Sequence, residues 1–276
     1  MEFLQPPTWR EALEARAAHP DALPIWGGTD VMVELNFARK RPPALLDLTR
    51  VDELSRWTVE DGGVRIGAGV SYSRVITELG DRLPGLAMAS RTVGSPQIRN
   101  RGTIGGNLGS SSPAGDALPP LFAAGAEVEL ASTGGTRRVP VEDFVTGPKR
   151  NGLAPDELIA GVRVPVRAGS AQQFAKVGTR NAMVIAVCSF ALDVSDGRVG
   201  TCIGSAGPTP IRAREAEAFA EGLDTWSEDA GRRFGDLVAM AASPIDDVRG
   251  SAAYRRHALG VLARRTLKWA MVSRCA

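Results

Sequence analysis

Residues 23–31 of this chain are Leu23-Pro24-Ile25-Trp26-Gly27-Gly28-Thr29-Asp30-Val31, an apolar run followed by two glycines and two polar residues. The apolar run predicts a strand, the glycine pair a tight turn, and the residues from Val31 to Leu35 a helix with Thr29 or Asp30 as its N-cap. Glycine lets a backbone approach a ligand closely, and a helix N-terminus carries partial positive charge. This strand–turn–helix unit is therefore a candidate phosphate site.

A second stretch of similar composition, Thr103-Ile104-Gly105-Gly106-Asn107, lies near the middle of the chain. It belongs to a segment, 94–115, so rich in Gly, Ser, Asn and Pro that we expect an ordered loop there rather than a helix or strand. A single glycine pair is most often just a tight turn. Two such stretches in successive α/β units favour a pair of loops that grip one diphosphate from both sides.

Two familiar phosphate motifs do not fit the sequence. It contains no G-x-x-x-x-G-K-[ST], so a Walker-type nucleotide site is excluded. Gly67-Ala68-Gly69 begins like a dinucleotide fingerprint, but Tyr72 stands where the third glycine is expected, which excludes an ordinary Rossmann loop.

The composition excludes several other classes of function. The net charge is +2 and basic residues are spread among acidic ones, which argues against nucleic acid as the main partner. No run of about 18 apolar residues is present, so we expect no membrane span, and without a signal-like N-terminal segment we expect the cytosol. The three cysteines are scattered, and so we expect no disulfide framework, zinc site or iron–sulfur cluster.

Acid–base catalysis also has little to draw on. The only two histidines, His19 and His257, are expected at the surface or at helix ends, and we expect no catalytic residue and no metal ligand. The arginines Arg255, Arg256 and Arg264, together with Arg265, are expected on a solvated or partner-facing helix surface.

The 276 residues suffice for two or three compact units, and we place boundaries near residues 55 and 165, giving 1–55, 56–165 and 166–276.

Thr8 and Glu11 have capping-box spacing at the start of a first helix, and Asp116 is expected to cap a helix over 117–124. We expect a buried stripe of Leu259, Leu262, Thr266 and Trp269 on the last helix. Strands are expected at 44–48, 64–68, 127–131, 137–141, 159–164, 173–177, 184–193 and 199–204, and helices at 72–79, 83–93 and after 211.

Three stretches together resemble the FAD-binding medium subunit of molybdenum hydroxylases, the xanthine dehydrogenase and carbon monoxide dehydrogenase group. They are residues 26–30, residues 98–107 and Ser112-Pro113-Ala114-Gly115-Asp116. The segment 247–256 is similar to that family's C-terminal signature, so the resemblance covers essentially the whole chain.

The resemblance implies an α+β fold with two α/β FAD-binding subdomains of the vanillyl-alcohol-oxidase-like (PCMH) type, followed by a smaller α+β domain. It also implies that FAD lies in a cleft between them. The residues carried over as FAD contacts are Ile25, Trp26, Gly27, Gly28, Thr29, Asp30, Val31, Thr103, Ile104, Gly105, Gly106, Asn107, Ser112, Asp116, Leu153 and Lys176.

The resemblance gives some of these residues distinct roles. Asp116 matches an acidic residue at the ribityl or flavin region, and Leu153 an apolar residue near an edge of the cofactor. Lys176 matches a basic residue that reaches the isoalloxazine ring, where a cation stabilises reduced flavin and raises its potential. Without the resemblance, Lys176 would be taken for a strand lysine facing solvent.

The implied function is electron transfer, with FAD collecting electrons from 2Fe-2S clusters on a small partner subunit. A molybdopterin-binding large subunit would carry out the hydroxylation. NAD, oxygen or a quinone would be the acceptor, and the purine or xanthine branch is our first expectation for the whole complex. The chain lacks the cysteine-rich insertion of 4-hydroxybenzoyl-CoA reductase, which disfavours that branch.

Several alternatives stay open. Carbon monoxide, aldehyde or N-heterocycle oxidation is also compatible with the resemblance. A self-contained flavin oxidase is a second class, although two Tyr and two His offer little for a substrate site. A flavin-free interaction module is a third.

Overall fold

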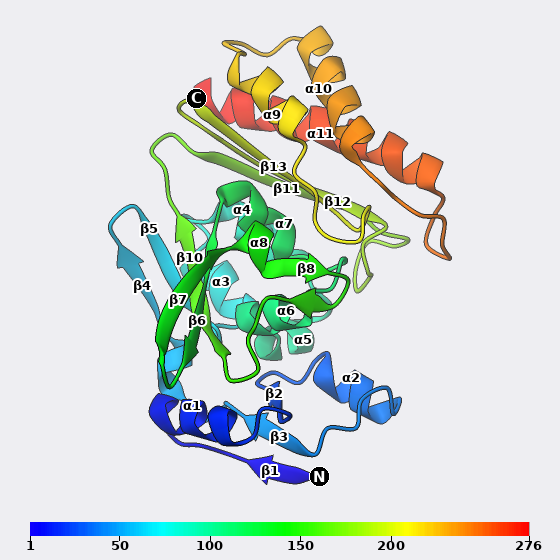
Figure 1. Cartoon of the computed structure of the whole chain (residues 1–276). Coiled ribbons are helices and arrows are strands. Elements are labelled where there is room, and N and C mark those ends of the chain that lie inside the picture. The colour runs from blue at the N-terminus through cyan, green and yellow to red at the C-terminus, as the bar shows by residue number, and fades with distance from the viewer. Residues whose placement is uncertain (276) are drawn as a thin grey trace.

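The computed structural model describes residues 1–275, in which three main sheets follow one another along the molecule from the N-terminus towards the C-terminal helix (Figure 1). The first sheet is parallel and three-stranded, in the order β1-β3-β2. Helix α1 begins where the sequence predicts, because the Thr8 hydroxyl accepts a hydrogen bond from the Glu11 amide. The elements of this region are β1 (Glu2–Leu4), α1 (Trp9–Ala18), β2 (Leu23–Ile25), α2 (Val31–Asn36) and β3 (Ala44–Asp47).

The second sheet is antiparallel and five-stranded, in the order β4-β5-β10-β6-β7. Its strands are β4 (Trp57–Glu60), β5 (Gly63–Gly67), β6 (Glu127–Ser132), β7 (Gly135–Pro140) and β10 (Leu158–Pro165). Apolar residues of β5, β6 and β10 pack with those of the neighbouring helices into one core. Those helices are α3 (Tyr72–Glu78), α4 (Pro84–Thr92), α6 (Ile104–Ser110) and α7 (Leu118–Ala124).

Shorter elements complete this region. A 3-10 helix, η1 (Asp52–Ser55), leads from the first sheet to the second. The others are α5 (Pro96–Arg101), α8 (Val141–Phe144) and the two-stranded hairpin β8 (Val145–Gly147) and β9 (Arg150–Asn151).

The third sheet, β11-β12-β13, is antiparallel and covered on both faces (Figure 1). Helices α9, α10 and α11 pack on one face, and α4 and α7 of the second region lie against the other. Every residue of the central strand β12 is therefore buried. The elements are β11 (Ala171–Val177), β12 (Cys188–Ser195), β13 (Arg198–Gly204), α9 (Arg214–Glu221), α10 (Glu228–Ala241) and α11 (Ala252–Cys275).

The expectation of a loop without helix over 94–115 is wrong. Two short helices, α5 and α6, form there, and Ser95 and Thr103 accept the capping hydrogen bonds at their starts. The glycines reflect close packing rather than irregular backbone, because a Cβ on Gly105 would lie 2.5 Å from the Cβ of Ala68.

Three smaller expectations fail, and a fourth, the N-cap of α2, is met in position but without the capping bond. Asp116 does not cap α7, whose N-cap is Ala117, because its carboxylate bonds elsewhere. Asp30 occupies the N-cap position of α2 but its side chain makes no capping bond. Trp269 is 48% exposed, and small residues of α11 such as Ala270 face the sheet instead. Arg255 is buried and donates to Asp247 and to the Ser205 carbonyl rather than facing solvent.

The expected exposure of the two histidines is confirmed. His19 and His257 are exposed, and Cys188 and Cys202 are buried free thiols. Within residues 1–275, no helix is long and apolar enough to cross a membrane.

The crossing of α10 and α11 depends on a glycine contact. A Cβ on Gly235 would lie 2.6 Å from the Gly260 carbonyl oxygen, so Gly235→Ala must push the helices apart. We expect a loss of about 1–3 kcal/mol in the free energy of unfolding, measured by urea denaturation. Gly222→Ala is the matched control, because its Cβ would meet nothing closer than 3.7 Å. Equal stability of the two variants would contradict this packing.

Candidate functional site

The first glycine stretch meets the backbone that directly precedes the second one. A Cβ on Gly27 would lie 1.9 Å from the Arg101 carbonyl oxygen and 3.1 Å from the Gly102 nitrogen. No side chain fits between these backbones, so glycine is required at position 27. The Arg101 guanidinium also donates a weak hydrogen bond, 3.5 Å long, to the Trp26 carbonyl. The first sheet is thereby joined to the second region just before α6.

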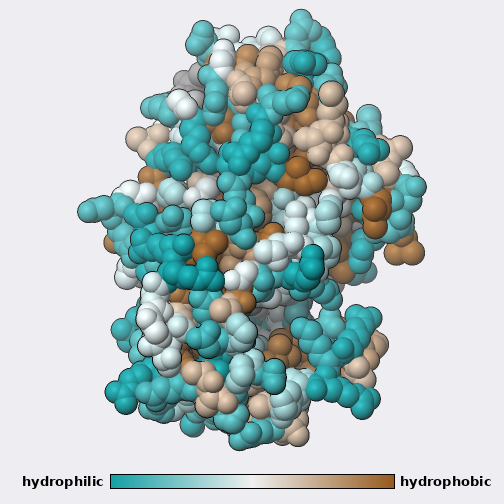
Figure 2. Space-filling model, viewed as in Figure 1, coloured by the Kyte–Doolittle hydropathy of each residue, from teal (hydrophilic) through white to brown (hydrophobic). Residues whose placement is uncertain are grey.

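The turn after β2 presents a row of free backbone donors. Within residues 1–275, none of the amides from Gly27 to Val31 donates to an acceptor. Gly28 has a φ of +73°, a conformation that favours glycine and folds the turn back on itself. Unbonded amides on a glycine turn form a concave site for an anion such as a diphosphate. Figure 2 shows the surface hollowed between the lowest part of the molecule and its middle.

The second glycine stretch differs from the first in its hydrogen bonding. Its amides are already used, since Ile104 donates to the Val70 carbonyl, Gly105 to the Ala68 carbonyl, and Gly106 to the Thr103 hydroxyl. Asn107 donates to the Thr103 carbonyl as part of the helix. These amides thus have acceptors within the chain, and their contact with a diphosphate from a second side stays a prediction.

Lys176 and Asp116 form a buried ion pair between the second and third regions. The Lys176 ammonium lies 2.6 Å from Asp116 Oδ2 and 3.3 Å from the Thr92 carbonyl oxygen, and the Thr92 hydroxyl also donates to Asp116. The two charged side chains are 6% and 8% exposed. Burial raises the pKa of Asp116, and the lysine acts against that rise. The reading of Lys176 as a solvent-facing lysine is therefore wrong.

Two polar atoms near this pair lack a partner. Asp116 Oδ1 and Asn107 Oδ1 are enclosed and make no hydrogen bond within residues 1–275. The Asn107 amide lies against Gly115, where a Cβ would be 2.7 Å from it, so the loop over 111–115 holds Asn107 and Asp116 in one region. Ser112 fixes that loop by accepting hydrogen bonds from Ala114 and Gly115.

A salt bridge that the sequence does not predict joins the β8–β9 hairpin to α2. The turn between β8 and β9 places Lys149 2.6 Å from Glu34 of α2, 115 residues away in sequence. The hydrogen bond from Lys149 lowers the pKa of Glu34. The Asn151 side chain donates a hydrogen bond to the Gly109 carbonyl and so joins the same hairpin to α6. Leu153, one of the predicted cofactor contacts, lies two residues further on and packs against the core. No local motif marks Lys149, because its partner is defined only by the fold.

The remaining predicted residues lie around the turn. Ile25 ends β2 and its side chain approaches Gly28. The Trp26 ring packs on Gly69, where a Cβ would lie 2.6 Å from it, so that ring contributes to the core. Thr29 and Val31 are half-buried beside the free amides.

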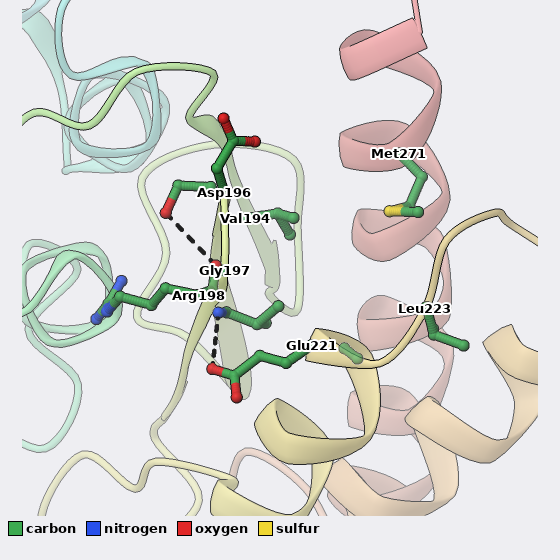
Figure 3. A pocket seen from close by; sticks show the side chains of 10 residues that line it. Val194, Asp196, Gly197, Arg198, Glu221, Leu223 and Met271 are labelled. Atoms are coloured by element: carbon green, nitrogen blue, oxygen red, sulfur yellow. Dashed lines mark hydrogen bonds between the residues drawn. The ribbon is translucent and has the colours of Figure 1, made fainter.

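A partly open pocket lies elsewhere, in the third region, and is lined by none of the residues above. It has a volume of about 200 Å³ and opens at the β12–β13 turn, between Met271 of α11 and Glu221 of α9 (Figure 3). The Glu221 carboxylate accepts a hydrogen bond from the Val199 amide there. Among residues 1–275 there is also no cluster of three His, Cys, Asp or Glu side chains that could hold a metal.

Free amides on a glycine turn and a buried lysine–aspartate pair suit a protein that binds an anionic cofactor. Residues 1–167 match the FAD binding domain in molybdopterin dehydrogenase, and residues 173–270 match the CO dehydrogenase flavoprotein C-terminal domain. The chain belongs to the FAD-binding medium subunits of the molybdenum hydroxylases, the xanthine and carbon monoxide dehydrogenase family. FAD is its cofactor, and it is the flavin subunit rather than the substrate-hydroxylating one.

Individual relatives agree with this assignment over most of their length. A putative xanthine dehydrogenase FAD-binding subunit of Escherichia coli strain K12 is 30% identical, covering 96% of this chain and 94% of the relative. A nicotinate dehydrogenase FAD-subunit of Eubacterium barkeri is 34% identical, with 80% and 79% covered. The solved carbon monoxide dehydrogenase of Hydrogenophaga pseudoflava contains a chain that is 29% identical with a TM-score of 0.92, covering 100% and 98%.

The contact at Gly27 can be tested by the smallest possible side chain. Gly27→Ala places a methyl group on the Arg101 carbonyl, so the turn must move and its free amides no longer converge. We expect the purified variant to lose most of its bound FAD, measured as flavin absorbance per protein. Gly109→Ala in α6 is the control, because its Cβ would meet only the Ile159 side chain at 3.7 Å. Full flavin content in the Gly27 variant would refute the assignment.

The ion pair can be tested by pH. Lys176→Met leaves Asp116 buried without its cation, which costs about 3–5 kcal/mol of unfolding free energy at neutral pH. The pKa of Asp116, already raised by burial, then rises further. A raised folded pKa stabilises the fold below the unfolded pKa, and this contribution is lost as pH rises through the folded pKa.

We therefore expect the loss in Lys176→Met, relative to the wild type, to shrink as pH falls from about 7 to about 5. Urea unfolding at both pH values measures it. The double variant with Asp116→Leu should recover much of the stability, because it removes the uncompensated charge. A loss of equal size at both pH values would contradict the assigned pairing.

Proposed function

We propose that this chain relays electrons within a molybdenum hydroxylase complex, from 2Fe-2S clusters on a small partner subunit through its own FAD to a final acceptor. A molybdopterin-binding large subunit would carry out the hydroxylation. The membership of the chain in the flavin-subunit family carries this proposal. It is supported by the scattered cysteines, which offer no set of cluster ligands.

The residues of the site suit the cofactor. The free amides from Gly27 to Val31 would hold the diphosphate, because they are donors without competing acceptors among residues 1–275. FAD supplies the redox chemistry, in one-electron and two-electron steps. Lys176 would bring positive charge to the ring, while Asp116 fixes the position of that charge through a 2.6 Å contact. Asn107, Ser112 and Leu153 would line the rest of the hollow.

The finer assignments are also proposals. A xanthine or purine dehydrogenase with NAD as acceptor is our first choice, with carbon monoxide, aldehyde or N-heterocycle oxidation as the alternative. Relatives named for xanthine, nicotinate, glyceraldehyde and carbon monoxide are 29–34% identical in sequence, so this similarity does not rank the substrates. We further propose unit boundaries near residues 55 and 165, supported by the separate sheets on either side of each.

The relay can be separated from the hydroxylation by experiment. The chain is purified alone and with its two partner subunits, and xanthine is added without oxygen. We expect the flavin to be bleached only in the complete complex. A complex that carries Gly27→Ala should still reduce its iron–sulfur centres but fail to reduce NAD. Reduction of the flavin by xanthine in the isolated chain would favour the self-contained oxidase instead.

A further inference from the structure

Tyr72 lies where the first glycine stretch meets the backbone that directly precedes the second one. It is the first residue of α3, and its amide donates to the Gly102 carbonyl. A Cβ on Gly102 would lie 3.1 Å from Tyr72 Cε2, while Gly27 approaches the Gly102 nitrogen from the other stretch. Cε2 is bonded to the ring carbon that carries the hydroxyl. A Cβ on Gly102 would also lie 3.2 Å from Cδ2, so this edge of the ring packs on Gly102, next to the backbone that Gly27 approaches.

The Tyr72 hydroxyl has no partner in the protein. The residue is 4% exposed, yet within residues 1–275 its hydroxyl makes no hydrogen bond. The hydroxyl oxygen is not completely enclosed, and it retains a small solvent-accessible surface. A nearly buried tyrosine hydroxyl normally has a hydrogen-bond partner, because a buried hydroxyl without one destabilises the fold. This donor is consistent with a ligand that is not part of the chain.

The charges around Tyr72 keep the hydroxyl protonated. Burial raises its pKa, and the carboxylates of Asp116 and Asp30 raise it further. Both carboxylates therefore lie within electrostatic reach of the hydroxyl. Asp30 belongs to the glycine turn, and Asp116 holds Lys176 at the other end. Because its pKa is raised, the hydroxyl stays protonated and is a hydrogen-bond donor over the whole working pH range.

We propose that the Tyr72 hydroxyl donates a hydrogen bond to an oxygen of bound FAD, on the stretch that links the flavin ring to the diphosphate. The inference rests on the proposed binding of the diphosphate at Gly27–Val31. It gives a role to a residue that the sequence marks only as a departure from the dinucleotide fingerprint. The acceptor is a ribityl hydroxyl or the first phosphate, both of which are oxygen acceptors in that stretch.

Tyr72→Phe tests the inference, with Tyr254→Phe as the matched control. The chain has two tyrosines, and Tyr254 is half exposed on α11. FAD is titrated into the flavin-free full chain and binding is followed by flavin fluorescence. We expect about tenfold weaker binding for Tyr72→Phe, the size of one lost hydrogen bond, and wild-type binding for Tyr254→Phe.

Unfolding of the flavin-free chain supplies a second readout. Removing a hydroxyl without a partner should leave its stability unchanged or raise it, whereas removing a structural hydrogen bond should lower it. Weaker FAD binding without loss of stability is therefore the expected signature. FAD binding equal to that of Tyr254→Phe would overturn the inference, and so would a clear loss of stability in the flavin-free variant.

Smaller flavins separate the two acceptors. A weaker binding of riboflavin by Tyr72→Phe would identify a ribityl oxygen, and an effect confined to FMN and FAD would identify the phosphate. Either result supports the hydrogen bond. If the wild-type chain binds FAD and only the Tyr72 comparison fails, the proposed function stands without this contact. A wild-type chain that binds no flavin would overturn both.

Discussion

The site depends on one backbone contact, the approach of Gly27 to the Arg101 carbonyl. Because a Cβ at Gly27 would lie 1.9 Å from that oxygen, the two backbone segments can lie this close only with glycine at position 27. The contact sets the first sheet against the second region and holds the turn with the free amides at the edge of the hollow. Tyr72 and Gly102 pack directly behind it.

A second contact joins the other end of the site in a different way. Asp116 precedes α7, and Lys176 lies on β11 of the third sheet, so their ion pair ties two separately built regions together. Such a pair is costly to bury, and its value lies more in position than in stability. It places a positive charge at a defined point, where a reduced flavin would need it. Both ends of the expected cofactor site are thus contacts between regions.

This arrangement suits an electron relay. The described residues hold no metal cluster and no arrangement of histidines for acid–base chemistry, and a flavin that only passes electrons needs neither. The protein's task is to bind, orient and tune the cofactor. Relatives named for different substrates are 29–34% identical to this chain over most of their own length, which is consistent with substrate choice lying on another subunit.

The sequence by itself determined the local elements: the strand–turn–helix at Gly27-Gly28, most of the later strands, and the family resemblance that points to FAD. These depend on periodicity and glycine placement, which are local properties. Only the tertiary structure decided that the amides after β2 stay free while those of Ile104–Asn107 are used, that residues 94–115 form helices, and that Lys176 is buried. The reason is that distant carbonyls and side chains, which the fold brings close, decide whether an amide has an acceptor and whether a charge is buried.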